Sequence, residues 1–156
     1  MVIGVPAQSP RVSVVLPVYN GGAHLHASIE SVLRQTMTEL ELVVVDDGST
    51  DNTLEIATSF ADPRISVIAL ESNVGLAEAL NRGIDQAKAG LIARQDSDDV
   101  SLPDRLSRQL ELFTREDSMV LAGTWASITR SLPGGNQQVV GQHRHPTTDA
   151  ELRFRL

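Results

Sequence analysis

The sequence predicts an α/β fold with a mostly parallel central sheet and helices on both faces. Short β-branched runs alternate with amphipathic stretches of about ten to fifteen residues, which is typical of parallel strands joined by helices. The 156 residues match one ordinary domain, and 41% of them are hydrophobic, enough for a sizeable core. Polar clusters follow three of the runs, where open sheets of this class bind their ligands. We therefore expect a single domain over residues 1–156.

The amino-terminal third of the chain predicts two strands and two helices. Residues 12–16 are a β-branched run followed by a proline and two glycines, as expected of a buried strand that opens into a tight loop. The apolar residues of 23–34 recur at helical spacing and predict a helix. A second strand is expected at 42–45, and Asp51 or Thr50 is expected to cap the helix that follows it.

The middle of the chain repeats this alternation. A third strand is expected at 65–70, followed by a helix at 74–88 that Gly90 would end. A short apolar strand is predicted at 91–93. The S-x-x-D pattern of 101–104, which includes a proline, predicts the start of a further helix.

The pattern is weaker in the last third of the chain. A fifth strand is predicted at 119–122, where the residues are mostly apolar. Residues 133–136 are typical of a turn between two short strands. A final helix is expected to begin within 148–156.

Charge and composition exclude several classes of function. The net charge is −7 without any cluster of Lys and Arg, which argues against a nucleic-acid partner. The absence of cysteine excludes disulfides and thiolate metal sites and fits a reducing compartment. No apolar run reaches the roughly 20 residues of a membrane span, and no secretory signal pattern is present. A cytoplasmic location is the expectation.

The strongest chemical signal is the D-x-D tripeptide Asp96-Ser97-Asp98 at the end of a predicted strand. Residues two apart lie on the same side of an extended backbone, so both carboxylates can address one ligand. Hard oxygen ligands favour Mg²⁺ or Mn²⁺, and such ions are usually shared with substrate phosphates, so a diphosphate partner is implied. The alternative is a turn whose aspartates cap the following helix, a role that suits Asp99.

Two other polar clusters allow both binding and structural interpretations. The carboxylates of Asp46 and Asp47 can accept hydrogen bonds from helix N–H groups, or one of them can accept an N–H from a nucleobase edge. Considered alone, this pair favours the capping role. Tyr19, the only tyrosine, is placed so that its ring can stack on a base, or it can pack within its loop.

Several familiar motifs are absent: G-x-G-x-x-G after a strand, G-x-x-x-x-G-K-[ST] and G-x-S-x-G. The segments that are present are VSVVLPVYN at 12–20, VVVDDGSTD at 43–51 and ARQDSDD at 93–99. Shorter matching segments are 35–36, 73–76, 79–84 and 102–106 with Gln109. In this order and spacing they strongly resemble the family 2 glycosyltransferases of Rossmann-like GT-A fold, over roughly residues 11–125.

The resemblance implies a nucleotide site. By this resemblance Pro17 and Tyr19 belong to the loop that packs against the base, and Asp47 bonds to the edge of the base. Asp96 lies on the ribose side. Asp46 is a weaker candidate for nucleotide contact. Uridine is the commonest base of the family, so a UDP-sugar donor is expected.

The resemblance also implies a metal-assisted, inverting transfer of the sugar to an acceptor hydroxyl. Asp98 matches the ligand of Mn²⁺ or Mg²⁺, an ion that stabilises the leaving diphosphate as a Lewis acid. A carboxylate must deprotonate the acceptor as it attacks. The acidic motif that supplies this base in the family is expected beyond Leu156, because Asp149 and Glu151 match no catalytic motif.

The chain is therefore expected to be the donor-binding portion of such an enzyme, ending before the acceptor-binding region and transferring little or no sugar alone. The acceptors implied are glycans or lipid-linked glycans of polysaccharide synthesis, which allows peripheral association of the full protein with the inner face of a membrane. Two alternatives stay open: a non-catalytic nucleotide-binding module of the same fold, and a nucleotidyltransferase. The latter should carry a Gly-rich basic loop near its first strand, and Gly21-Gly22 has no lysine nearby.

Overall fold

The structure is a computed structural model that describes residues 9–115, 119–132 and 137–143. The chain divides into two compact units, Met1–Ser107 and Arg108–Leu156. The first unit is an α/β sheet with its helices, and the second contains a β-hairpin. The division into these units does not test the prediction of a single domain over residues 1–156.

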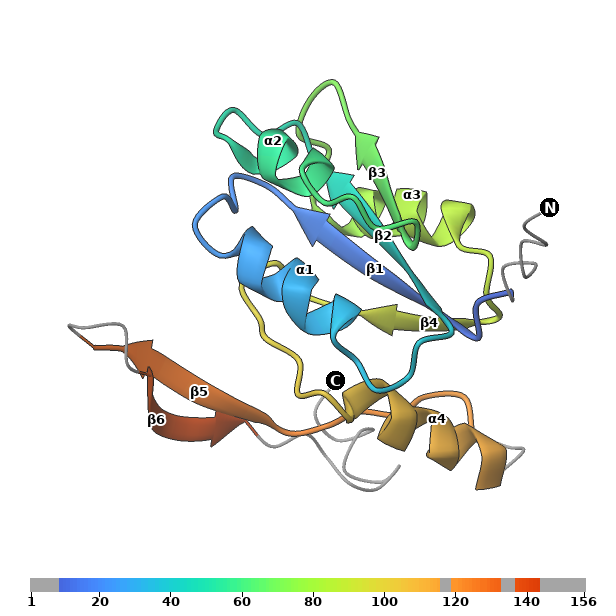
Figure 1. The fold of residues 1–156 in the computed structure, drawn as a ribbon. Helices are drawn as coiled ribbons and strands as arrows, with labels where there is room; N and C mark the ends of the chain where they lie inside the picture. The colour runs from blue at the N-terminus through green and yellow to red at the C-terminus, as the bar shows by residue number, and fades with distance from the viewer. Residues whose placement is uncertain (1–8, 116–118, 133–136, 144–156) are drawn as a thin grey trace, which may run out of the picture. The chain divides into compact units, whose positions relative to one another are not determined.

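The first unit is built on a four-stranded parallel sheet (Figure 1). Its strands are β1 (Val12–Val18), β2 (Leu40–Asp46), β3 (Ile65–Ala69) and β4 (Leu91–Arg94), in the order β3-β2-β1-β4. Every residue of β1 and β2 is buried, because these two strands are central and covered on both faces. The predicted parallel sheet is confirmed.

Helices cover both faces of this sheet, as predicted. Figure 1 shows α1 (Leu25–Leu33) and α2 (Thr53–Thr58) in front of the sheet and α3 (Leu76–Gln86) behind it. On the α3 side the approach is close: a Cβ atom on Gly83 would lie 2.4 Å from Cγ1 of Val15 in β1. The glycine therefore lets the helix backbone rest directly on the central strands.

The helix α3 is shorter at both ends than the predicted span of 74–88. Gly75 precedes it with φ 90°, a left-handed conformation that favours glycine. At the other end Ala87 is extended, and the backbone N–H of Lys88 donates to a carboxylate oxygen of Glu41 at 2.6 Å. Because this side chain takes the amide that would continue the helix, α3 ends at Gln86, before Gly90 is reached.

Two predicted helix caps have different outcomes. Asn52 is the N-cap residue of α2, without a side-chain cap hydrogen bond, so neither Asp51 nor Thr50 occupies the cap position; Asp51 still accepts the N–H of Thr53, the first residue of α2, at 3.0 Å. The predicted cap at 101–104 is wrong in its geometry. The hydroxyl of Ser101 donates to Oε1 of Gln95 at 2.6 Å, and α4 (Arg105–Arg115) begins only after this segment.

Beyond Ser107, α4 continues to Arg115, and the strands β5 (Ala126–Ser131) and β6 (Gln137–His143) form an antiparallel hairpin. This confirms the two strands predicted around 133–136, although the turn itself and the helix predicted at 148–156 lie outside the described residues. The predicted strand at 119–122 is wrong. Its residues are irregular because no described strand pairs with them, and Val120 is 93% exposed. Among the described helices, none has the length and apolar content needed to cross a membrane.

Candidate functional site

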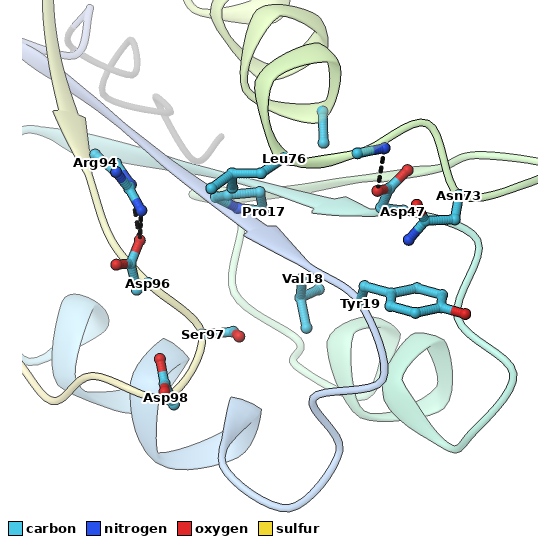
Figure 2. Close-up of a pocket in the computed structure, with 12 residues that line it drawn as sticks. Pro17, Val18, Tyr19, Asp47, Asn73, Leu76, Arg94, Asp96, Ser97 and Asp98 are labelled. Atoms are coloured by element: carbon cyan, nitrogen blue, oxygen red, sulfur yellow. Dashed lines mark hydrogen bonds and ion pairs between the residues drawn. The ribbon is translucent and has the colours of Figure 1, made fainter.

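A pocket of about 460 Å³ lies at the carboxyl ends of β1, β2 and β4 (Figure 2). It brings together five of the predicted site residues, namely Pro17, Tyr19, Asp47, Asp96 and Asp98. The other lining residues are Val18, Asn73, Gly75, Leu76, Ala79, Arg94 and Ser97. Parallel strands that end at one edge of a sheet deliver the residues after them to one place, so the fold explains this convergence.

The pocket has two chemically different ends. Figure 2 shows Tyr19, Asn73 and Asp47 toward one end, and Asp96 and Asp98 toward the other. The first end offers an aromatic ring and amide or carboxylate edges, and half of Tyr19 is exposed to contact a ligand. The second end is charged.

The loop that carries Tyr19 is tied to the turn after β2. Oδ1 of Asn20 accepts the N–H of Thr50 at 2.8 Å, and the N–H of Asn20 donates to Oγ of Ser49 at 2.9 Å. Next to it, Gly21 donates its N–H to the hydroxyl of Thr53 at 3.0 Å. Asn20 has φ 50°, a conformation that asparagine tolerates better than most residues. The two loops therefore support each other, and this fixes the backbone next to Tyr19.

Asp47 holds another wall of the pocket in place. Its carboxylate is buried and accepts the N–H of Val74 at 2.7 Å and that of Gly75 at 2.9 Å. Gly48 makes this approach possible, because a Cβ there would lie 2.5 Å from the carbonyl carbon of Ser72. Asp47 thus has a structural role, in that it binds the N–H groups of the two residues that precede α3. Since each carboxylate oxygen has two lone pairs, Asp47 can still accept an N–H from a ligand.

Asp46 belongs to the turn and is not among the residues that line the pocket. It is 2% exposed, and its Oδ1 accepts the N–H of Ser49 at 3.1 Å. Its backbone carbonyl accepts the N–H of Leu70 at 2.9 Å. The structure therefore gives Asp46 a role in shaping the loop that follows β2.

Arg94 is a pocket residue that the sequence did not single out. It is the one basic residue among those lining the pocket, and its Nε and Nη2 atoms lie 2.8 Å and 2.7 Å from the same oxygen of Asp96. Both side chains are partly exposed, so the pair adds little to stability. Arg94 lies two residues before Asp96, and that spacing at a strand end was the available signal.

A buried glutamine supports the acidic loop from within. Gln95 is 2% exposed, and its Nε2 donates to the carbonyl of Asp99 at 2.8 Å and to the hydroxyl of Ser28 at 3.2 Å. Its Oε1 accepts from Ser101 and from Nη1 of Arg105, each at 2.6 Å. The amide of Gln95 therefore joins the acidic loop to Ser28 of α1 and to Arg105 at the start of α4.

The acidic loop is crowded with negative charge. The pKa of Asp99 is raised, first by desolvation and then by the carboxylates of Asp96 and Asp98. Among the described residues, no group of three or more His, Cys, Asp or Glu side chains is arranged to hold a metal ion. One or two carboxylates suit Mg²⁺ or Mn²⁺ when phosphate and water complete the coordination, so these residues fit such an ion together with a diphosphate.

The family model described as Glycosyl transferase family 2 matches residues 13–153. The chain belongs to this family. It is 41% identical over 118 residues to "Putative glycosyltransferase EpsE" of Bacillus subtilis (strain 168), a match that covers 74% of this chain and 42% of that protein. It is 34% identical over 135 residues to "UDP-Glc:alpha-D-GlcNAc-diphosphoundecaprenol beta-1,3-glucosyltransferase WfgD" of Escherichia coli, covering 86% of this chain and 51% of that protein.

Solved structures of family 2 enzymes place the fold as GT-A. The chain resembles S. aureus TarS residues 1–349 in complex with UDP-GlcNAc, with a TM-score of 0.64, 31% identity, and coverage of 67% of this chain and 31% of that one. It also resembles the mannosyltransferase PcManGT from Pyrobaculum calidifontis in complex with GDP-Man and Mn²⁺, with a TM-score of 0.62 and 27% identity, covering 69% and 33% of the two chains. The predicted family and fold are confirmed, and a nucleotidyltransferase is no longer favoured. This family 2 chain spans about half or less of the length of these relatives.

Proposed function

We propose that this chain binds the nucleotide-diphosphate-sugar donor of a glycosyltransferase, with a UDP-sugar as the donor that fits best. One observation carries the proposal: residues from three separate motifs, predicted to bind nucleotide and metal, line one pocket at the carboxyl ends of the strands. Support comes from the related structures that contain UDP-GlcNAc or GDP-Man.

The end of the pocket that holds Tyr19, Asn73 and Asp47 is assigned to the nucleobase. The ring of Tyr19 is half exposed and can stack on a base, an interaction that contributes about 1–3 kcal/mol in nucleic-acid complexes. Pro17 also lines the pocket and adds a rigid apolar surface to it. Asp47 lies at the same end and can accept the N3–H of uracil while its other lone pairs hold Val74 and Gly75.

The charged end is assigned to the ribose and diphosphate. Asp96 would accept a ribose hydroxyl, and Asp98 would hold Mn²⁺ or Mg²⁺. Such an ion, when bound, neutralises negative charge on the leaving diphosphate. Arg94 adds a second positive charge in the same pocket and would compensate the remaining phosphate charge.

We further propose an inverting transfer whose base lies outside the described pocket. The pocket carboxylates already have other partners or assigned ligands. Asp47 accepts two backbone N–H groups, Asp96 pairs with Arg94, and Asp98 is assigned to the cation. The acceptor would be a glycan or a lipid-linked glycan in polysaccharide synthesis; the name of WfgD gives alpha-D-GlcNAc-diphosphoundecaprenol for that relative. A cytoplasmic location at the inner face of a membrane would follow from such an acceptor.

Calorimetric titration of the chain with UDP, with and without Mn²⁺, tests the donor site. We expect Mn²⁺ to strengthen UDP binding by about tenfold, a difference of about 1.4 kcal/mol. The substitution Asp98→Asn should remove this gain, because the amide is a poor ligand for a hard cation. Asp85→Asn is the matched control, since Asp85 is an exposed residue of α3 outside the pocket. Equal UDP affinity with and without Mn²⁺ in the wild-type chain would contradict the proposal.

A further inference from the structure

The acidic loop after β4 is positioned by a side chain that does not line the pocket. Arg105, at the start of α4, donates from Nη1 to Oε1 of Gln95 at 2.6 Å and to the hydroxyl of Ser101 at 2.8 Å. Its Nη2 donates to the backbone carbonyl of Arg94 at 2.7 Å. One guanidinium therefore joins the residue before the acidic loop, the glutamine that supports it and the serine that follows it.

The contacts of Gln95 complete this support. Its amide nitrogen donates to the carbonyl oxygens of Asp96 and Asp99, at 3.3 Å and 2.8 Å. The carbonyl of Asp96 also accepts the N–H of Asp99 at 3.1 Å, which closes the loop as a turn. The shape of the loop thus depends on the backbone oxygens bound by Gln95, and the orientation of Gln95 depends on Arg105.

Charge gives Arg105 a second effect on the same loop. The loop contains three carboxylates within four residues, at Asp96, Asp98 and Asp99. Arg105 interacts favourably with Asp99 and Asp96, and its partial burial lowers its own pKa. A partly desolvated cation below the loop reduces the mutual repulsion of these carboxylates before any metal ion binds.

We propose that Arg105 is a positioning residue that holds the Asp96–Asp99 loop in the geometry for binding a divalent cation and a diphosphate. It acts through Gln95 and through its charge, and it contacts neither ligand itself. The identity of the ligands rests on the proposed function, whereas the effect on the loop does not. A preorganised loop binds its ligand more tightly because it loses less conformational entropy on binding.

The first test measures hydrogen exchange of the ligand-free chain. The N–H groups of Asp99 and Ser101 report on the loop, because they donate to Asp96 and to Oγ of Ser31. In Arg105→Gln these amides should exchange about tenfold faster, while those of β2 keep wild-type rates. Arg34→Gln is the matched control, since Arg34 is exposed and pairs only with Glu30 among the contacts described for it. Wild-type exchange at Asp99 and Ser101 in Arg105→Gln would overturn the proposal.

The second test separates positioning from general stability. A merely structural role would weaken UDP binding equally with and without Mn²⁺. If Arg105 positions the loop, UDP affinity in the presence of Mn²⁺ should fall about tenfold in Arg105→Gln. UDP affinity without metal should fall less than about threefold. Arg105→Lys should lie between, because it keeps the charge and loses the fork of donors. If Arg105→Gln does not fold, the Arg105→Lys variant decides the question. If Arg105→Gln folds and Mn²⁺ still strengthens its UDP binding as much as in the wild-type chain, the inference is also overturned.

The two readouts keep this inference and the proposed function distinguishable. Absence of any Mn²⁺ gain in the wild-type chain contradicts the proposed donor site. Even then, exchange at Asp99 and Ser101 without ligand still decides whether Arg105 positions the loop. Fast exchange confined to the loop in Arg105→Gln supports the inference, and unchanged exchange contradicts it.

Discussion

Asp47 combines two tasks that are usually considered separately. Its two oxygens hold the N–H groups of Val74 and Gly75, and the same carboxylate borders the pocket. Gly48, with φ 69°, brings the chain close enough for these contacts. The residue that the proposal assigns to the base edge therefore also builds the wall behind the base.

Replacement of Asp47 should consequently affect both folding and binding. In Asp47→Asn the amide nitrogen cannot accept a backbone N–H, so one buried hydrogen bond to a charged group is lost, with a decrease of about 1–3 kcal/mol in the free energy of unfolding. UDP affinity should decrease as well. Urea unfolding and calorimetry measure the two effects. Asn73→Ala is the contrasting variant: it changes an exposed pocket residue and should weaken UDP binding with little loss of stability.

The helix α3 depends on a polar cluster at the edge of the sheet opposite the pocket. Glu41 in β2 is 6% exposed and accepts from the hydroxyl of Ser13 and the N–H of Lys88, each at 2.6 Å. The hydroxyl of Ser13 in turn accepts the N–H of Ala89 at 3.0 Å. The ammonium of Lys88 lies 3.1 Å from the second oxygen of Glu41. This cluster fixes the connection from α3 to β4.

The cluster predicts how stability depends on pH. Burial raises the pKa of Glu41, but hydrogen bonds from Ser13 and Lys88 and the charge of Lys88 outweigh it and hold the pKa below its usual value of 4.5. A lowered pKa means that this stabilisation is complete above the unfolded-state pKa and is lost as pH falls below it. Glu41→Gln should thus lose about 1–3 kcal/mol at pH 7, and the difference from wild type should shrink below about pH 4.5.

Unfolding curves of both proteins at neutral and acidic pH measure this difference. Glu39→Gln serves as the control, because Glu39 forms an exposed pair with Arg11 at 3.7 Å and should change stability little at either pH. A difference between wild type and Glu41→Gln that stays constant from pH 7 to pH 3 would show that ionisation of Glu41 is not involved.

At the scale of the whole chain, the proposed donor pocket has no assigned base. Every residue that lines the pocket lies in the first of the two compact units, before Ser107. The relatives EpsE and WfgD are about twice as long as the part that matches. We therefore expect donor binding and sugar transfer to be separable in this polypeptide.

We expect the 156-residue chain to bind UDP with Mn²⁺ and to transfer little or no sugar. The physical reason is that no carboxylate of the described pocket is available to deprotonate an acceptor hydroxyl. Incubation with radiolabelled UDP-sugar and added glycan acceptors measures transfer, with Asp98→Asn as the control for non-enzymatic background. Transfer that is clearly above background and depends on Asp98 would refute this expectation.

The sequence predicted most of the sheet and five of the twelve residues that line the pocket, because these follow from local patterns. The buried strands are β-branched runs, and the site residues of known families lie directly after them. It did not predict the partners that those residues have in space. The hydrogen bonds of Asp47 to Val74 and of Gln95 to Arg105 join residues 27 and 10 positions apart, which no local pattern encodes. The prediction of a strand at 119–122 was wrong for a related reason: a strand needs a neighbouring strand to pair with, and no described strand pairs with these residues.

Two buried acids, Glu41 near the start of β2 and Asp47 directly after its end, accept backbone N–H groups at the two ends of the α3 segment. Glu41 and Asp47 are six residues apart, which corresponds to about 20 Å at about 3.3 Å per residue of strand. Their amide partners, Lys88 and Gly75, are thirteen residues apart; the helical part between them, Leu76–Gln86, is about 16 Å long at about 1.5 Å per residue, and the non-helical backbone of Gly75 and Ala87 supplies the rest. The α3 segment thus reaches from one carboxylate to the other along β2. An insertion within β2 or α3 is therefore expected to separate one of these carboxylates from its amide partner.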